Sequence, residues 1–307
     1  MTSDRFIEGK LSQFVAYCAF RVLSAYIFED YMQKLVDGMT TDGHTAAADA
    51  IMTTDTIRKE VAVEFEIDGK VCHLGGMAKG SGMIHPNMAT TLNFVTTDVA
   101  VTTEMVQKAL SDIVKVTYNC LSIDGDTSTN DMVSVMANGL AGNKEITAEG
   151  EDYDKFKQAL YIVMSNMTKM LASDGEGASK LLECTCGGAP DIETAIIVAK
   201  SVIRSPLFKC AMFGEDANWG RILCAIGYAE ADFDIAKVSV SLRSEVGSVK
   251  VCENGAGVEF SEDEAAKILA KDEIFIDIDL GQGDVSAKAW GCDLTYDYVK
   301  INGDYRS

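Results

Sequence analysis

Apolar and polar residues alternate along several stretches of the chain, which predicts β-strands with one buried face. Residues 60–74 alternate in this way around Asp68-Gly69, a dipeptide typical of the turn of a β-hairpin. Residues 92–97 predict a further short strand.

Apolar residues at helical spacing predict a helix that follows this strand, is capped by Thr102 or Thr103 and runs to about Tyr118. The other expected elements are strands at 132–136, 180–186, 237–242, 248–252, 274–278 and 285–290, and helices at 152–171, 192–204 (closed or followed by Pro206), 219–227 and 262–270.

Strands and helices interleave to the end of the chain without repeats or low-complexity tracts. This order is typical of the α/β or α+β class with a mixed sheet. The 307 residues and 47% hydrophobic content are enough to bury a substantial core, as one large domain or as two lobes.

Acidic side chains outnumber basic ones by 47 to 27, for a formal net charge of −20. Such a charge repels nucleic-acid phosphates and anionic membranes, so neither is expected as a partner. No apolar run approaches the roughly 20 residues that cross a bilayer, and the N-terminus shows no secretory signal. A cytoplasmic protein is therefore expected, and the charge is more typical of keeping a protein dispersed than of attracting cationic amino acids.

The nine cysteines are scattered through apolar segments, which is typical of reduced thiols rather than of a disulfide framework. Cys184 and Cys186 have no second cysteine pair or histidine near them in the sequence, so no metal site is predicted.

The most unusual stretch is GGMAKGSGMIHPNMATT, residues 75–91, between the expected hairpin and the next strand. Its glycines allow positive φ or a close approach of the backbone, and Pro86 restricts the conformation of His85. Taken alone, the stretch is typical of a long surface loop.

Six blocks of the chain match, in order, the motifs of one enzyme family. They are AIMTTDT (50–56), GGMAKGSGMIHPNMAT (75–90), SIDGDTSTND (122–131), DGEGASK (174–180), GEDANWGRI (214–222) and AWGCDLTYDYVKINGDYRS (289–307). On these blocks the chain resembles the ornithine acetyltransferase family, also called bifunctional glutamate N-acetyltransferase.

The resemblance implies an α/β (α+β) fold with two stacked β-layers sandwiched by helices, as in DmpA- and ornithine acetyltransferase-like proteins. It implies a main lobe, residues 1–190, that contains a self-cleavage site and is family-like from about residue 32. A smaller C-terminal lobe is expected at 191–307.

The resemblance also implies that the chain cleaves itself between Ala89 and Thr90, into pieces 1–89 and 90–307. The hydroxyl of Thr90 attacks the carbonyl of Ala89, in a backbone that strain primes for attack, and water hydrolyses the resulting ester. The freed α-amine, with an ordinary pKa of about 7.7–8.0, then serves as the base for its own hydroxyl, so no histidine is needed.

The reaction that this family implies is a ping-pong transfer in arginine biosynthesis. N-acetylornithine gives its acetyl group to Thr90, ornithine leaves, and glutamate accepts the group. Some members also use acetyl-CoA as donor, which the sequence leaves open here, and no cofactor is expected. The expected assembly is a heterotetramer of two copies of each cleaved piece.

Five further residues in the matching blocks are expected to contact substrate. Lys79 offers a positive charge for an α-carboxylate, and Glu176, between two glycines, a carboxylate for an ammonium group. The others are Thr56, Asn302 and Ser307, the last two in a C-terminus that folds back toward the pocket in the family. Without the resemblance, each is an ordinary turn, surface or tail residue.

The block SIDGDTSTND places alternate acceptors from Asp124 to Asn130 as a calcium loop does. Its sixth position is Thr129 rather than glycine and its twelfth is Val135 rather than glutamate, so an EF-hand is not predicted. The loop is expected instead to order the backbone around the active site.

The N-terminal region departs from the family pattern. Family members carry a longer segment there, with a Thr-Gly pair that stabilises the oxyanion, and Leu23, Ser24 or Ala25 takes that place here. Loss of an oxyanion donor costs about 10²–10³ in rate. Exposed apolar surface is also expected near residues 10–35.

Two other functions stay open at this point. One is an aminopeptidase or amidase, in which the same nucleophile passes its acyl group to water. The other is a non-catalytic amino-acid-binding protein that is never cleaved.

Overall fold

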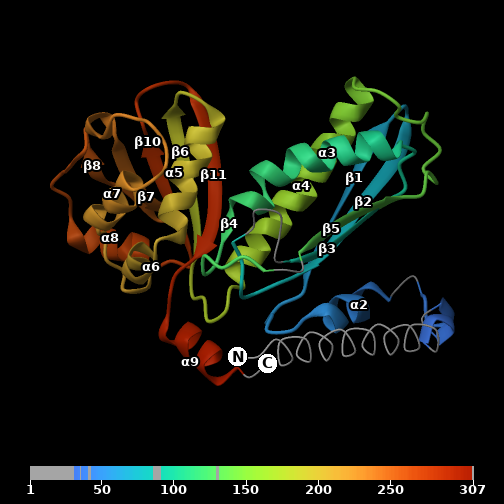
Figure 1. Ribbon diagram of the computed structural model, residues 1–307, viewed down its shortest axis with the longest axis horizontal. Helices are drawn as coiled ribbons and strands as arrows, with labels where there is room; N and C mark the ends of the chain where they lie inside the picture. The colour runs from blue at the N-terminus through green and yellow to red at the C-terminus, as the bar shows by residue number, and fades with distance from the viewer. Residues whose placement is uncertain (1–30, 35, 41–42, 86–90, 129–130, 306–307) are drawn as a thin grey trace, which may run out of the picture. The chain divides into compact units, whose positions relative to one another are not determined.

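The computed structural model describes residues 31–34, 36–40, 43–85, 91–128 and 131–305 (Figure 1). The chain divides into two compact units, residues 1–47 and 48–307. Every strand of the described chain lies in the second unit.

The first sheet has four strands in the order β1-β2-β3-β5. The hairpin of β1 and β2 turns at Asp68 and Gly69, both with positive φ (52° and 68°), and β3 pairs antiparallel with β2 and parallel with β5. The strands are β1 (Lys59–Ile67), β2 (Lys70–Lys79), β3 (Leu92–Thr97) and β5 (Met132–Ala137).

Two helices accompany this sheet, α3 (Thr103–Val116) and α4 (Glu151–Ser173). Thr102 caps α3 by accepting a hydrogen bond from the backbone N–H of Met105. Acidic residues in the first turn of α4 complement the helix dipole. Helix α4 packs against β1, β2 and α3, and it also contacts β6 and β11 of the second sheet.

The second sheet has seven strands in the order β4-β11-β6-β10-β7-β8-β9. Strand β10 runs parallel to β6 and β4 parallel to β11, while the other pairs are antiparallel. The strands are β4 (Leu121–Ser122), β6 (Leu181–Ala189), β7 (Ser239–Ser244), β8 (Gly247–Glu253), β9 (Ala256–Gly257), β10 (Glu273–Asp279) and β11 (Val285–Cys292).

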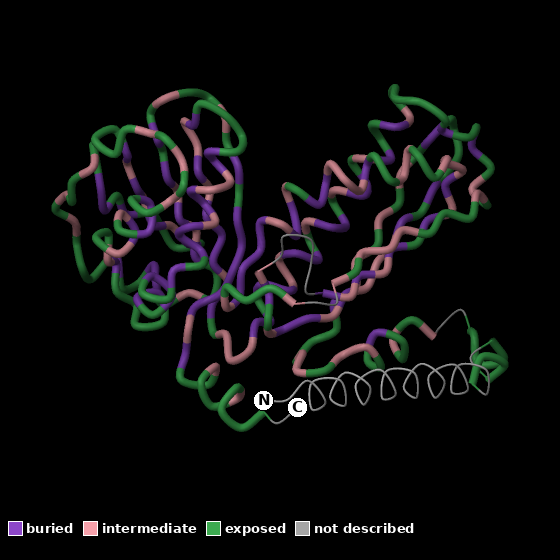
Figure 2. The backbone as a smooth tube through the Cα atoms, viewed as in Figure 1, coloured by how far each residue is buried: buried purple, intermediate pink, exposed green. Residues whose placement is uncertain are grey.

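Of the remaining helices, α5 packs on β6 and β11 of this sheet, and α8 packs on β7 and β8. Figure 2 shows buried positions running along the strands and the inner faces of the helices. The helices are α2 (His44–Ile51), α5 (Ile192–Arg204), α6 (Pro206–Phe213), α7 (Trp219–Gly227), α8 (Glu262–Leu269) and α9 (Tyr296–Asp304), with short 3₁₀ turns η1 (Tyr118–Cys120) and η2 (Ile235–Lys237).

The mixed α/β class expected from the sequence is confirmed, and the predicted elements are present within a few residues. Three of the helices were not predicted, α2, α6 and α9. Pro206 does follow the end of α5, but it also opens α6 at its first position, where its missing N–H costs nothing. The lobe boundary at 190 stays a prediction; β6, which ends before it, pairs with β10 and β11 beyond it.

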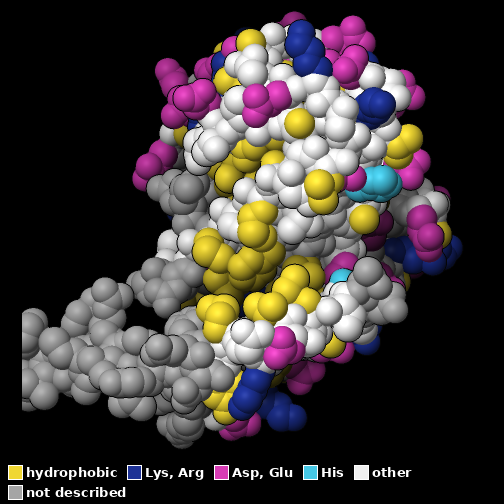
Figure 3. Space-filling model, turned by 90° about the vertical axis from the view of Figure 1, so that its right-hand side faces the viewer, with side chains coloured by type: hydrophobic (Ala, Val, Ile, Leu, Met, Phe, Trp, Pro, Cys, Tyr) yellow, Lys and Arg dark blue, Asp and Glu magenta, His cyan; other side chains and the backbone are white. Residues whose placement is uncertain are grey.

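The surface carries exposed apolar side chains among acidic ones, as the face in Figure 3 shows. Of the stretch near residues 10–35 that is expected to expose apolar surface, Tyr31 and Met32 are described and both are exposed, and the rest lies largely outside the described residues. In the described part of the chain, none of the helices has the length and apolar character required to span a membrane.

Candidate functional site

A pocket of about 280 Å³ brings together blocks that are far apart in the sequence. Its walls come from the AIMTTDT block, the end of β2 and the glycine loop after it, the SIDGDTSTND loop, the turn after α4, and the C-terminal helix α9 with the residue that follows it. The lining residues are Thr53, Thr54, Lys79, Gly80, Ser81, Gly82, Met83, Ser128, Glu176, Asn302 and Tyr305.

Three of the sequence-predicted site residues, Lys79, Glu176 and Asn302, line this pocket. The side-chain amide of Asn302 donates a hydrogen bond of 2.8 Å to Oε2 of Glu176. The pocket therefore presents an ammonium, a carboxylate and an amide, which are the groups needed to bind a zwitterionic amino acid.

Two glycines let the pocket walls approach each other. A methyl group at Gly82 would overlap the carboxylate of Glu176, and one at Gly177 (φ +69°) would overlap the backbone at the start of α9. Glycine at these two positions is thus a condition for placing Glu176 beside the loop and beside Asn302.

A buried triad of Lys59, Asp55 and Asp174 holds the walls together. The ammonium of Lys59 lies 2.7 Å from Asp55 Oδ1 and 2.5 Å from Asp174 Oδ2, and all three side chains are nearly inaccessible to solvent. Asp55 also accepts the backbone N–H of Gly80 at 2.7 Å. The backbone carbonyl of Asp174 accepts the hydroxyl of Ser81 at 2.6 Å.

Hydrogen bonds and the ion pair with Lys59 compensate for the burial of the Asp55 carboxylate. Burial alone raises the pKa of Asp55, but hydrogen bonds from Gly80 and Lys59 outweigh it and hold the pKa below its ordinary value. Because the backbone N–H of Glu176 donates to the carbonyl of Ser81 at 2.8 Å, the turn that carries Glu176 is fixed to the loop that carries Gly82.

Thr56 is tied to the triad rather than to the pocket. Its hydroxyl and its backbone N–H both donate to the carboxylate of Asp174, and it is absent from the pocket lining, where Thr53 and Thr54 lie instead. Its substrate contact stays a prediction. Ala89, Thr90 and Ser307 lie outside the described residues.

The loop of SIDGDTSTND anchors the backbone just before residues 86–90. The carboxylate of Asp124 accepts the N–H groups of Met83 (2.6 Å) and Ile84 (2.9 Å), and Met83 has a positive φ of 55°. The hydroxyl of Thr127 donates to the carbonyl of His85 at 2.8 Å. The loop thus orders the backbone next to it, and that this backbone surrounds the active site stays a prediction.

The same loop leads to an anchor on the other side of residues 86–90. The N–H of Met132 donates to the carbonyl of Thr91 at 2.9 Å, and the amide of Asn93 donates to the hydroxyl of Thr91.

The ring of His85 contacts Ser122 Oγ at 3.0 Å. Burial, helped by the nearby Lys200 and Arg204, lowers the pKa of His85 to about 4, so this imidazole is neutral near pH 7.

A family model described as "ArgJ family" matches residues 21–307 of the chain. The chain belongs to the ArgJ family. The expected resemblance is therefore confirmed, and it covers almost the whole sequence.

Relatives of this ArgJ-family chain carry the name arginine biosynthesis bifunctional protein ArgJ. The protein ArgJ 1 from Clostridium acetobutylicum is 52% identical over 261 residues, 85% of this chain and 64% of its own length. The one from Caldanaerobacter subterraneus is 50% identical over 283 residues, 90% of this chain and 70% of its own length. The chain thus spans about two thirds of the length of the curated relatives it matches.

A crystal structure of arginine biosynthesis bifunctional protein ArgJ from Bacillus halodurans is also similar to this chain. It is 44% identical, with a TM-score of 0.66, over 69% of this chain and 98% of the crystallised one. This likeness confirms the fold class.

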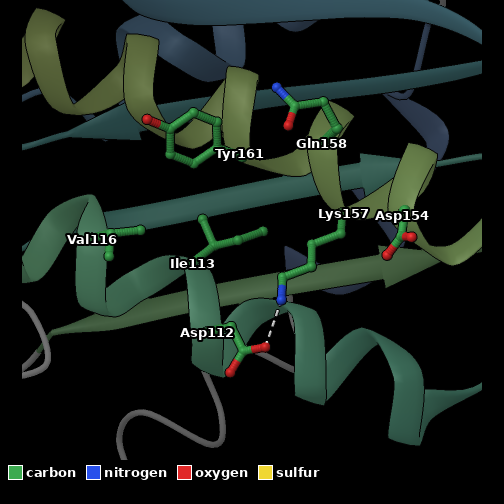
Figure 4. A pocket seen from close by; sticks show the side chains of 7 residues that line it. All are labelled: Asp112, Ile113, Val116, Asp154, Lys157, Gln158 and Tyr161. Carbon is green, nitrogen blue, oxygen red and sulfur yellow. Dashed lines mark hydrogen bonds and ion pairs between the residues drawn. The ribbon is translucent and has the colours of Figure 1, made fainter. Parts of the chain in front are cut away.

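A larger hollow of about 440 Å³ lies between α3 and α4 (Figure 4). The ion pair of Lys157 and Asp112, 2.6 Å apart, spans it. None of the residues predicted from the sequence to act on substrate lines it, so its size does not make it the candidate site of this ArgJ-family chain.

Sequence reasoning missed the triad and the tyrosine at the pocket rim. Asp55, Asp174 and Tyr305 lie inside matching blocks, which was the available signal, whereas Lys59 lies outside all six blocks. Among the described residues, no cluster of three or more His, Cys, Asp or Glu side chains is placed to hold a metal ion.

Proposed function

We propose that this chain transfers the acetyl group of N-acetylornithine to glutamate in arginine biosynthesis, through an acetyl ester on Thr90. Membership of the ArgJ family supports the reaction class. The observation that carries the proposal is the pocket that joins Lys79, Glu176 and Asn302 beside Gly80–Met83, the loop that leads into the residues before Thr90.

The charges of the pocket suit the proposed donor and acceptor. The ammonium of Lys79 binds a carboxylate, which N-acetylornithine and glutamate both carry, and the carboxylate of Glu176 binds the side-chain ammonium of N-acetylornithine. Asn302 orients Glu176 through its 2.8 Å hydrogen bond. One pocket can thus receive the donor and then the acceptor, as a ping-pong reaction requires.

Self-cleavage between Ala89 and Thr90 precedes the reaction. The hydroxyl of Thr90 attacks the carbonyl of Ala89, the C–N bond breaks, and water hydrolyses the ester to leave a free carboxylate and a free α-amine. The anchors at Met83, Ile84 and Thr91 support this step, because they hold the chain on both sides of the bond.

The length of the crystallised relative also supports cleavage. Its match covers 69% of 307 residues, about 212, and these make up 98% of that chain. Residues 90–307 of this chain number 307 − 89 = 218. A polypeptide of nearly this length is what scission before the threonine would release.

The mature protein is proposed to act in the cytoplasm as a heterotetramer of two copies of each piece. Acetyl-CoA is a further candidate donor, because a threonine hydroxyl can take an acetyl group from a thioester as well as from an amide. No cofactor is included in the proposal.

Incubation with N-acetylornithine, with and without glutamate, tests the function. Formation of N-acetylglutamate that depends on glutamate and disappears in Thr90→Ala is expected. Release of acetate at the same rate without glutamate would instead identify an amidase. A chain that stays intact and forms neither product would identify a binding protein.

A further inference from the structure

Three buried oxygen acceptors lie on two paired strands, at the start of β3 and directly before β5. Both carboxylate oxygens of Asp131 and Oδ1 of Asn93 are shielded from solvent and have no hydrogen-bond partner in the structure of the described chain. Buried acceptors are almost always paired in folded proteins, so three unpaired ones on neighbouring strands call for a donor.

The register of the sheet places these groups beside Thr91. Leu92 pairs with Met132 in the parallel ladder, so Asp131 lies opposite Thr91. Thr91 and Asn93 are 1% and 0% exposed. The amide N–H of Asn93 is used on the hydroxyl of Thr91, which leaves its carbonyl oxygen, like Asp131, as an acceptor only.

Of these buried acceptors, the unpaired carboxylate of Asp131 costs the most folding free energy. Burial raises the pKa of Asp131 to about 6, because no positive charge compensates for the lost water. A nearby cation would remove this cost. The required ligand is therefore a small cationic group with several donors.

Scission of the chain would create such a group one residue from Thr91. Thr90 precedes Thr91, and cleavage converts its peptide nitrogen, which has one N–H, into a primary ammonium with three donors. We propose that Asp131 and Asn93 form the acceptor site for the α-ammonium group of Thr90, an inference that rests on the proposed self-cleavage.

In this arrangement Asp131 is a positioning residue that never touches the substrate. As the hydroxyl of Thr90 attacks the acetyl carbon, the O–C bond forms and the hydroxyl proton passes to the α-amine. The resulting ammonium, stabilised by the carboxylate of Asp131, then gives its proton to the departing ornithine nitrogen as the C–N bond breaks.

The test compares Asp131→Asn with Asp126→Asn, a matched change of an exposed carboxylate in the same loop. The pH dependence of labelling of the Thr90 α-amine is followed by mass spectrometry. In Asp131→Asn the pH at half-maximal labelling is expected to fall by about 1 or more. The kcat for acetyl transfer is expected to fall about 10–100-fold, with KM little changed. Asp126→Asn is expected to match the parent in the pH at half-maximal labelling, in kcat and in KM.

A second comparison distinguishes loss of the ammonium site from general misfolding of the Asp131→Asn variant. In the uncleavable Thr90→Ala background, Asp131→Asn removes an unpaired buried charge, so Tm at pH 7.5 is expected to stay level or rise. In the cleaved protein the same change is expected to lower Tm, because the ammonium loses its partner.

The outcomes separate this inference from the proposed function. If the parent is cleaved and active but Asp131→Asn labels at the parent's pH, the ammonium site is wrong and the acetyl transfer stands. A lower Tm for Asp131→Asn in the Thr90→Ala background would show a structural ion pair and also overturn the site. A parent that stays intact would overturn both.

Discussion

The amide nitrogen of Asn302 lies 2.8 Å from Oε2 of Glu176, and this hydrogen bond joins the C-terminal helix α9 to the turn after α4. The two residues are separated by 126 positions in the sequence, and both line the pocket. The C-terminal segment therefore forms a wall of the candidate site.

Replacement of Asn302 is expected to act on substrate binding rather than on stability. In Asn302→Ala, Glu176 loses the donor that orients it, so the KM for N-acetylornithine is expected to rise about 10-fold. Lys300→Ala, an exposed change on the same helix, is the control and is expected to leave KM unchanged. Steady-state kinetics decide, and an unchanged KM in Asn302→Ala would show that α9 does not shape the site.

Lys59 is expected to be a main contributor to the stability of the pocket walls. Lys59→Met leaves Asp55 and Asp174 buried without their cation and is expected to cost about 3–5 kcal/mol in the free energy of unfolding. The exposed pair of Lys155 and Glu151 is the comparison, and Lys155→Met is expected to leave the free energy of unfolding almost unchanged. Urea unfolding measures both, and equal costs would contradict the buried triad.

Gly82 is expected to tolerate no side chain. The methyl group of Gly82→Ala would overlap the carboxylate of Glu176, so kcat/KM is expected to fall about 10-fold or more. Gly227→Ala is the control, since its added methyl group meets no atom within 4 Å. Equal activity of the two variants would show that Glu176 can move away without loss.

Asp124 is expected to control the rate of self-cleavage. Asp124→Ala removes the acceptor of the N–H groups of Met83 and Ile84, which frees the backbone before the scissile bond. Cleavage is expected to slow about 10-fold or more, followed as the loss of full-length chain on a denaturing gel. A parallel time course of Asp126→Ala controls for the loss of charge.

Glu183 is expected to make folding stability depend on acid pH. Burial raises its pKa, but hydrogen bonds from Lys169, Lys288 and Trp290 outweigh it and lower the pKa to about 2. A depressed folded pKa contributes stability that is present above the unfolded value of 4.5 and is lost as the pH falls from about 4.5 to about 2.

Glu183→Gln should therefore be less stable than the parent at pH 6, and the difference should shrink below pH 4.5. Denaturant unfolding at a series of pH values measures this. If the difference in free energy of unfolding between the parent and Glu183→Gln stays constant down to pH 2, the ionised carboxylate of Glu183 does not stabilise the fold through its partners.

Much of the fold follows from local sequence signals. Thr102 caps α3 as expected, and Asn218 caps α7, since each side chain accepts a backbone N–H three residues on. Helix α9 was missed because it is short and buries no residue of its own, so no apolar stripe marks it.

The pocket could be predicted only in part, for a physical reason. Lys79, Glu176 and Asn302 stand in motifs that can be matched, but the link of Lys59 to Asp174 spans 115 positions and depends on how α4 packs on β1. Local pattern carries no information about such a contact. Thr56 shows the same limit, since its position in a motif did not reveal that its hydroxyl binds Asp174.

Intact mass of the purified protein, before and after addition of N-acetylornithine, tests the central claim most directly. Two polypeptides are expected, residues 1–89 and 90–307, and the larger one gains a single acetyl group on Thr90 when the donor is added without glutamate. A single polypeptide of 307 residues in a sample that transfers acetyl groups would contradict the mechanism.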